Sequence, residues 1–153
     1  MLRHPAHLVA LGAGAGLVPV APGTAGTLLA FPLDWALAST CTAPTLLGLI
    51  VLGFALGVWA CGRTGRALGV SDHGAIVWDE IVAFMLVLFF TPEGVLWQAF
   101  AFVLFRLFDI LKPPPIRYYD RKLKSGFGVM FDDLLAAGYS LLVLAVARML
   151  ITG

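Results

Sequence analysis

The chain has 153 residues, the length of one domain, and a formal net charge of only +1. Hydrophobic residues make up 60% of it, charged residues 12%, and the mean hydropathy is +0.94. Soluble domains carry about 25% charged residues, so this composition argues against an ordinary soluble surface and predicts lipid as the solvent. No basic patch alternates with aromatic residues, which argues against nucleic-acid binding. The two cysteines indicate neither a disulfide framework nor a zinc motif.

Five apolar segments follow one another along the chain. A membrane-spanning helix needs about 20 mostly apolar residues, and the candidates cover residues 24–38, 44–61, 76–90, 94–111 and 134–150. The first is short and contains a proline and an aspartate, so it either spans the membrane or enters and returns. We therefore predict an all-α, polytopic membrane protein with four to five transmembrane or re-entrant helices, forming a single domain over residues 1–153.

The basic residues indicate how these helices are oriented, because Lys and Arg favour the cytoplasmic side of a membrane. With the N-terminus inside, the loops at residues 39–43 and 91–93 lie outside, and neither contains Lys or Arg. Arg148 is the one basic residue near the outer end. Seven of the nine acids, all but Asp34 and Glu93, then fall at or near the cytoplasmic face. The sequence thus predicts a multi-pass protein whose polar site faces the cytoplasm.

Two pairs of adjacent acids suggest a functional site. Asp79 and Glu80 lie near the start of the third segment, and Asp132 and Asp133 directly precede the fifth. Either pair alone could simply stabilise a helix N-terminus, as an N-cap or through the helix dipole. However, ionisable side chains at membrane depth are costly and usually mark function, and two pairs at one face indicate a shared site. Because carboxylate oxygens suit Mg²⁺, we predict all four as metal ligands.

Other polar residues near this face suit an anion. Arg106 and Asp109 are three residues apart and hence on one helix face, where the simplest interpretation is a local ion pair. Yet Arg106 lies within an apolar segment, and its fork of donors suits a phosphate or a carboxylate. Thr24 follows a Pro-Gly turn and is a candidate N-cap, at a helix start whose free N–H groups could bind an anion. The small residues of this stretch could equally serve close helix packing. Lys112 precedes a proline, which predicts that the fourth helix ends there.

Three stretches resemble, in order, the motifs of the phosphatidylglycerophosphatase A family. They are APGTAGT at 21–27, DHGAIVWDE at 72–80 and FRLFDILKPPPIRYYDRKLKSGFGVMFDD at 105–133. The resemblance implies a Mg²⁺-dependent lipid phosphatase of the bacterial inner membrane, which converts phosphatidylglycerophosphate into phosphatidylglycerol and phosphate. It points to an acidic set and to three polar positions: Asp79, Glu80, Asp109, Asp132 and Asp133, and Thr24, Arg106 and Lys112. Two departures from the family pattern, Pro114 and Ser125, remove no charged group.

The hypothesis for the mechanism assigns a role to each of these groups. The four paired acids hold Mg²⁺, Arg106 and Lys112 hold the phosphate with Thr24 nearby, and Asp109 either orients Arg106 or acts as general base. Direct attack by water is the default, and an aspartyl-phosphate intermediate is the open alternative.

Two other kinds of protein are alternatives to a lipid phosphatase: a small transporter or scaffold, and a CDP-alcohol phosphotransferase. A small transporter or scaffold could use buried acids as a cation or proton relay, but a relay needs ionisable groups through the whole bilayer. Here the outer halves of the last three segments are almost bare of such groups. A CDP-alcohol phosphotransferase would carry a DG-x-x-AR pattern, which is absent. The sequence leaves open the oligomeric state, the number of metal ions and activity on other lipid phosphates.

Overall fold

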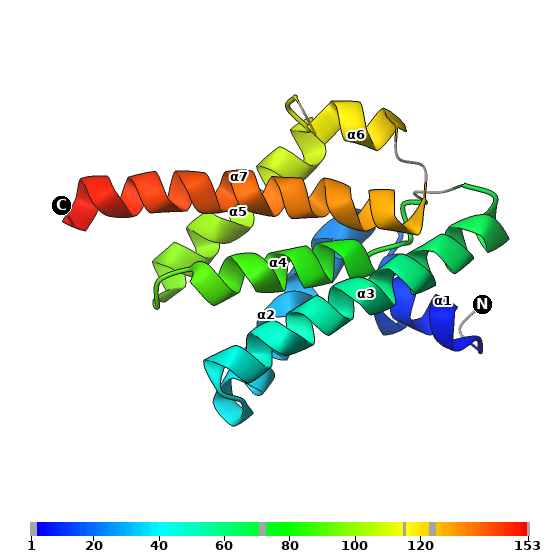
Figure 1. Ribbon diagram of the computed structural model, residues 1–153, viewed down its shortest axis with the longest axis horizontal. Coiled ribbons are helices and arrows are strands. Elements are labelled where there is room, and N and C mark those ends of the chain that lie inside the picture. The colour runs from blue at the N-terminus through cyan, green and yellow to red at the C-terminus, as the bar shows by residue number, and fades with distance from the viewer. Residues whose placement is uncertain (1–2, 71–72, 115, 123–124, 153) are drawn as a thin grey trace.

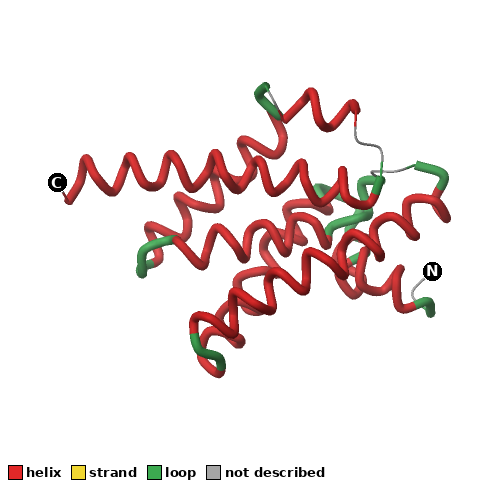
Figure 2. The backbone as a smooth tube through the Cα atoms, in the orientation of Figure 1, coloured by secondary structure: helices red, strands yellow, loops and turns green. Residues whose placement is uncertain are grey.

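The computed structural model describes residues 3–70, 73–114, 116–122 and 125–152, and every element in these ranges is a helix (Figure 2). The prediction of an all-α fold is therefore confirmed. In chain order the elements are α1 (Pro5–Ala10), the 3-10 helix η1 (Gly12–Leu17), α2 (Pro22–Thr40), α3 (Ala43–Leu68), α4 (Trp78–Phe90), α5 (Val95–Leu111), α6 (Ile116–Lys122) and α7 (Gly126–Thr152).

Helix α4 is the centre of the fold. It packs against α2, α3, α5 and α7, and Figure 1 shows it between α3 and α7. Eight of its 13 residues are buried. Phe84 lies on this buried surface and makes ring contacts with Phe31 of α2 and with Phe102 and Phe105 of α5. Because so many neighbours contact α4, side chains from its first turn can meet groups from several other helices.

Helices α3 and α7 cross very closely near the start of α7. A Cβ atom at Gly126 would overlap the carbonyl oxygen of Val58 and would lie 2.7 Å from the backbone nitrogen of Gly62. Only a residue without a side chain allows two helix backbones to approach in this way. From this crossing the two helices diverge toward their other ends (Figure 1).

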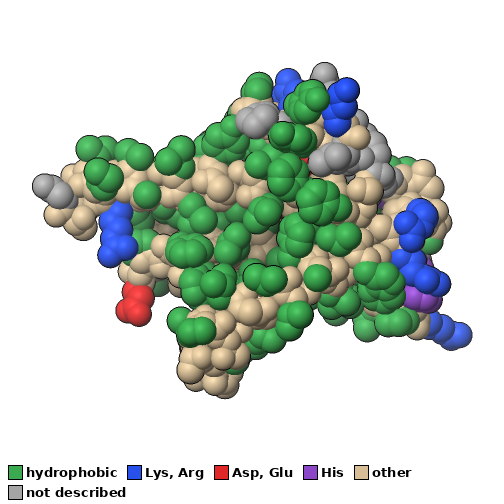
Figure 3. Space-filling view, in the orientation of Figure 1, with side chains coloured by type: hydrophobic (Ala, Val, Ile, Leu, Met, Phe, Trp, Pro, Cys, Tyr) green, Lys and Arg blue, Asp and Glu red, His purple; other side chains and the backbone are tan. Residues whose placement is uncertain are grey.

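The same two helices are long and apolar enough to cross a membrane. Each contains an 18-residue window of mean hydropathy 2.1, and at 1.5 Å per residue they are about 39 and 40 Å long. The hydrocarbon core of a bilayer is about 30 Å thick. Figure 3 shows hydrophobic side chains over much of the surface of the long helices, whereas basic side chains gather mainly over the end of α3 and over α6.

Two helices begin earlier than the hydropathy pattern predicted. Helix α7 begins at Gly126 rather than at residue 134, because Val129 and Met130 are buried against the rest of the fold. Asp132 and Asp133 consequently lie inside α7 and are not N-cap residues. Helix α2 begins at Pro22, with Ala21 as its N-cap in the left-handed region at φ 49°. The N-cap assignment of Thr24 is therefore wrong, since the fixed φ of a proline at the first helical position already starts the helix.

The short helix α1 is tied to α3 by a polar contact. His7 Nδ1 and Thr64 Oγ1 are 2.8 Å apart and share a hydrogen bond. Burial, followed by the nearby charge of His4, lowers the pKa of His7 below its usual value. The neutral imidazole is thus the form that the folded protein favours.

Candidate active site

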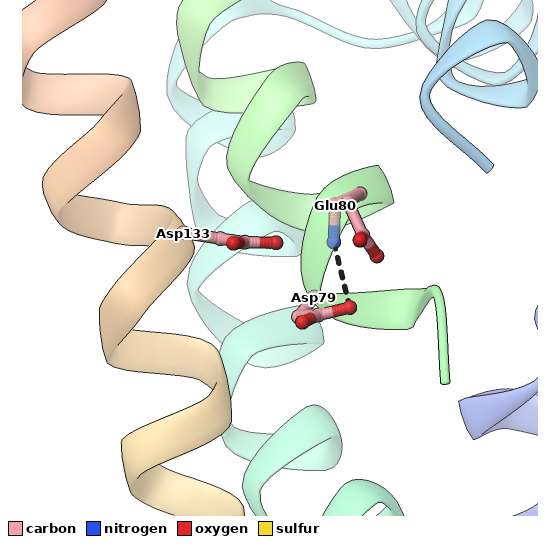
Figure 4. Close-up of side chains that lie close together, drawn as sticks. All are labelled: Asp79, Glu80 and Asp133. Atoms are coloured by element: carbon pink, nitrogen blue, oxygen red, sulfur yellow. Dashed lines mark hydrogen bonds between the residues drawn. The ribbon is translucent and has the colours of Figure 1, made fainter. Parts of the chain in front are cut away.

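Three carboxylates meet where α4 begins. Asp79 and Glu80 occupy the first turn of α4, and Asp133 reaches toward them from α7 (Figure 4). One oxygen from each side chain lies within 4.8 Å of the others. Asp79 Oδ1 also accepts a hydrogen bond of 3.0 Å from the backbone N–H of Glu80, which holds its orientation. Two helices far apart in sequence therefore present a compact group of oxygen ligands.

Two of the three carboxylates are buried and Glu80 is half-buried, and part of the group's hydrogen-bonding capacity is unused. Asp79 is 4% exposed and Asp133 is 2% exposed. Glu80 Oε2 and Asp133 Oδ2 are buried and have no hydrogen-bond donor in the described part of the chain. Buried carboxylates without partners are costly. An oxygen-liganded divalent cation such as Mg²⁺ fits this arrangement, because it takes carboxylate ligands and neutralises their charge.

Arg106 of α5 lies beside Glu80, one of the three acids. Its guanidinium forms an ion pair with Asp109 one turn further along α5, and its Nη1 atom is 3.9 Å from Glu80 Oε1. Arg106 Nε is buried with no acceptor among the described residues. Asp109 interacts electrostatically with Glu80 and with Asp133 as well. The expected Arg106–Asp109 pair is present, and it forms part of the wall of the acidic group.

Lys112 and Asp132 form a second ion pair close by. Lys112 ends α5 as its C-cap, and its Nζ is 3.9 Å from Asp132 Oδ2. Asp132 is buried but does not belong to the group of three mutually close carboxylates. Neighbouring residues on a helix point about 100° apart, so Asp133 faces α4 while Asp132 faces the end of α5.

The first turn of α2 closes the site from another direction. A Cβ atom at Gly23 would lie 2.9 Å from Glu80 Oε1 and 3.1 and 3.2 Å from the two terminal nitrogens of Arg106. Thr24 follows in the same turn and is half-buried. The first residues of a helix have N–H groups without intrahelical acceptors, so this turn presents such groups next to Arg106.

Two residues of α2, Gly23 and Thr27, contribute to this region but were not among the predicted site residues. The alternative interpretation of the small residues here, close helix packing, applies to Gly23, because its lack of a side chain is what allows α2 to reach Glu80 and Arg106. Thr27 is fully buried, and its hydroxyl donates a 2.8 Å hydrogen bond to the carbonyl oxygen of Gly23. The small residues of the PGTAGT stretch were the available signal, because they permit close helix contacts.

The fold is helical and includes two candidate membrane-spanning helices. Its site combines a group of carboxylates that suits a cation with an arginine that suits an anion. A sequence model of the family described as Phosphatidylglycerophosphatase A matches residues 8–148. The chain belongs to the phosphatidylglycerophosphatase A family. The family resemblance seen in the sequence is thus confirmed, and with it the assignment to the phosphatases that hydrolyse a phosphomonoester.

Curated relatives agree with this assignment. A Phosphatidylglycerophosphatase A from Haemophilus influenzae is 48% identical over 143 residues, covering 93% of this chain and 88% of the relative. The Escherichia coli protein of the same name is 41% identical, covering 88% and 78%. A Putative phosphatidylinositol-3-phosphatase from Bacteroides thetaiotaomicron is 40% identical over 151 residues, covering 94% of both chains. No solved structure matches this chain.

Proposed function

We propose that this protein is a Mg²⁺-dependent lipid phosphatase that hydrolyses phosphatidylglycerophosphate to phosphatidylglycerol and phosphate. The observation that carries the proposal is the group of three carboxylates, two buried and one half-buried, beside Arg106. The names of the relatives from Haemophilus influenzae and Escherichia coli support the choice of substrate.

Asp79, Glu80 and Asp133 would hold the metal ion, and Asp132 supports the site through Lys112. A bound Mg²⁺ would supply electrostatic stabilisation of the charge that develops on the phosphoryl oxygens. The unused oxygens of Glu80 and Asp133 are the groups that such an ion would engage. In this role the carboxylates would position the metal ion, and the ion would neutralise charge on the phosphate. Positioning and charge neutralisation supply most of the acceleration of phosphoryl transfer.

Arg106 would bind the phosphate through its planar fork of donors. The N–H groups at the start of α2, at Gly23 and Thr24, lie beside it and can donate to the same oxygens. Asp109 orients the guanidinium through its ion pair, and Lys112 adds positive charge at the end of α5. Water then attacks the phosphorus atom, and the lipid alcohol leaves.

We also propose a multi-pass arrangement in the bacterial inner membrane, with the site at the cytoplasmic face. The long apolar helices α3 and α7 support membrane insertion. The ends of α2, α4, α5 and α7 that carry the site lie together, and basic side chains gather at the end of α3 and over α6 (Figure 3). This charge distribution fits the preference of Lys and Arg for the cytoplasmic side.

The relative named as a Putative phosphatidylinositol-3-phosphatase makes a second headgroup a specific candidate. Both lipids present a phosphomonoester on a polyol, so the acidic group and Arg106 could serve either. Phosphate release by the purified protein from matched lipids carrying each headgroup decides between them, with the faster substrate identified by kcat/KM.

The test of the proposed chemistry is phosphate release from phosphatidylglycerophosphate with Mg²⁺ and after chelation. We expect activity to require the metal and to fall by at least about 10²-fold in Asp79→Asn and Asp133→Asn. Glu80→Gln should behave likewise, whereas its matched control Glu93→Gln, an exposed residue outside the site, should remain active. Near-normal Mg²⁺-dependent turnover in Asp79→Asn and Asp133→Asn would refute the carboxylate site.

A further inference from the structure

An apolar groove lies between α3, α4 and α7 and has no part in the chemistry described above. Its volume is about 200 Å³, and its lining residues include Val51 and Phe54 of α3, Val82, Ala83 and Leu86 of α4, and Leu134 of α7. None of the lining side chains carries a polar group. Figure 3 shows hydrophobic side chains over much of the face that α3, α4 and α7 form.

The groove lies within one to two helical turns of the acidic group. Residues three, four and seven positions apart share one face of a helix, and Val82, Ala83 and Leu86 stand at these distances from Asp79. On α7, Leu134 directly follows Asp133. Met130, one turn before Asp133, is buried and also lines the groove. One face of α4 therefore changes from carboxylate to hydrocarbon within a single turn.

We propose that this groove holds an acyl chain of the lipid substrate while its phosphate lies at the acidic group; the inference rests on the proposed function. Apolar cavities of about 150 Å³ stay dry and bind small hydrocarbons, so a groove of this size can accept part of a fatty-acid chain. A helix of a partner protein, about 10 Å wide, is too thick for it. The purely apolar lining equally excludes the headgroup.

The groove makes α3, α4 and α7 the elements that recognise the tail. The two helices that flank it are the two candidate membrane spans, so its opening would face the fatty-acid region of the bilayer. A lipid could then enter sideways with its chain between the helices and its phosphate beside Arg106. Recognition of the tail and chemistry on the headgroup would thus occupy adjacent turns of α4.

The test uses two exposed neighbours on α3. Val51, 61% exposed, lines the rim of the groove, whereas Leu52, 66% exposed, does not. Val51→Trp should narrow the entrance and Leu52→Trp should not, and both changes leave the core intact. Two forms of phosphatidylglycerophosphate serve as substrates: one with long acyl chains, presented in detergent micelles, and one with four-carbon acyl chains, which is soluble. They share the same headgroup and differ only in the length of the acyl chains.

We expect Val51→Trp to lower kcat/KM about tenfold on the long-chain lipid, mainly through KM, and less than twofold on the short-chain lipid. The tenfold loss corresponds to about two methylene groups that are no longer buried. Leu52→Trp should match the wild type on both. Ala83→Leu, which fills the groove from α4, should repeat the pattern, with the exposed Ala55→Leu on α3 as its control.

A lipid with a photoreactive group in mid-chain gives an independent readout. The proposal expects cross-links at Val82, Leu86 or Leu134, and cross-links confined to other helices would overturn it. The proposal is also wrong if Val51→Trp leaves kcat/KM on the long-chain lipid unchanged, or if the substitution lowers kcat/KM equally on both lipids. Absence of phosphate release from either lipid by the wild type would instead refute the proposed function, so the two failures are distinguishable.

Discussion

Replacing Gly23 by alanine is the sharpest probe of the turn that closes the site. The added methyl group would lie 2.9 Å from Glu80 Oε1 and 3.1 and 3.2 Å from the terminal nitrogens of Arg106. Ordinary contacts begin near 3.4 Å, so the Glu80 oxygen has to retreat by about 0.5 Å and the guanidinium by about 0.2 to 0.3 Å.

The size of the effect follows from these displacements. A misplacement of about 1 Å in a catalytic group can cost about 10²-fold in rate, so half that displacement should cost about tenfold in kcat/KM. Stability should change in the opposite direction or not at all, because alanine favours a helix over glycine by up to about 1 kcal/mol. A loss of activity without a loss of stability is therefore the expected signature.

The assay combines phosphate release with thermal unfolding of the purified variant. Gly48→Ala is the matched control, because Gly48 is an exposed glycine of α3 with no atom within 4 Å of the added methyl group. Wild-type kinetics in Gly23→Ala would show that the first turn of α2 plays no part in the site. A lowered Tm would show that the residue serves folding instead.

Four further predictions address other parts of the molecule. Arg106→Lys should lower kcat/KM by about 10²-fold, since a single ammonium replaces the planar fork; unchanged kinetics would remove Arg106 from the site. Gly126→Ala should lower the free energy of unfolding by about 1–3 kcal/mol in denaturant melts because it overlaps Val58, whereas Gly138→Ala, with open space around it, should not. Mg²⁺ should raise the Tm of the wild type but not of Asp133→Asn, because a ligand stabilises only the state that binds it. The lowered pKa of His7 means that protonation opposes folding, so Tm should fall as pH drops below about 6.5, and less so in His7→Gln.

The parts of the site that depend on local sequence were predictable. Asp79 and Glu80 fall in the first turn of α4, where acids followed by a long apolar run were expected to be. The end of α5 at Leu111 also followed from the prolines after Lys112. In each case the signal lies within a few residues of the feature that it determines.

The parts that depend on how helices are rotated against each other were not predictable. No sequence pattern distinguishes Asp132 from Asp133, because only the packing of α7 decides which of two adjacent side chains faces α4. The early start of α7 escaped a hydropathy pattern for a similar reason, since Val129 and Met130 are fixed by contacts with other helices. The contact of Gly23 with Glu80 and Arg106 joins three helices, and no short motif encodes it.

The close crossing of α3 and α7 also has a mechanical consequence. Where Gly126 touches the backbone at Val58 and Gly62, no side chain can yield, so the crossing acts as a fixed pivot. A change of about 5° in the angle between the helices would move the far end of α7 by about 3 Å but Asp133 by only about 1 Å. Asp133 therefore moves only about a quarter as far as the free end of α7, so the crossing reduces, at the carboxylates, the displacements that the surroundings impose on the helix ends.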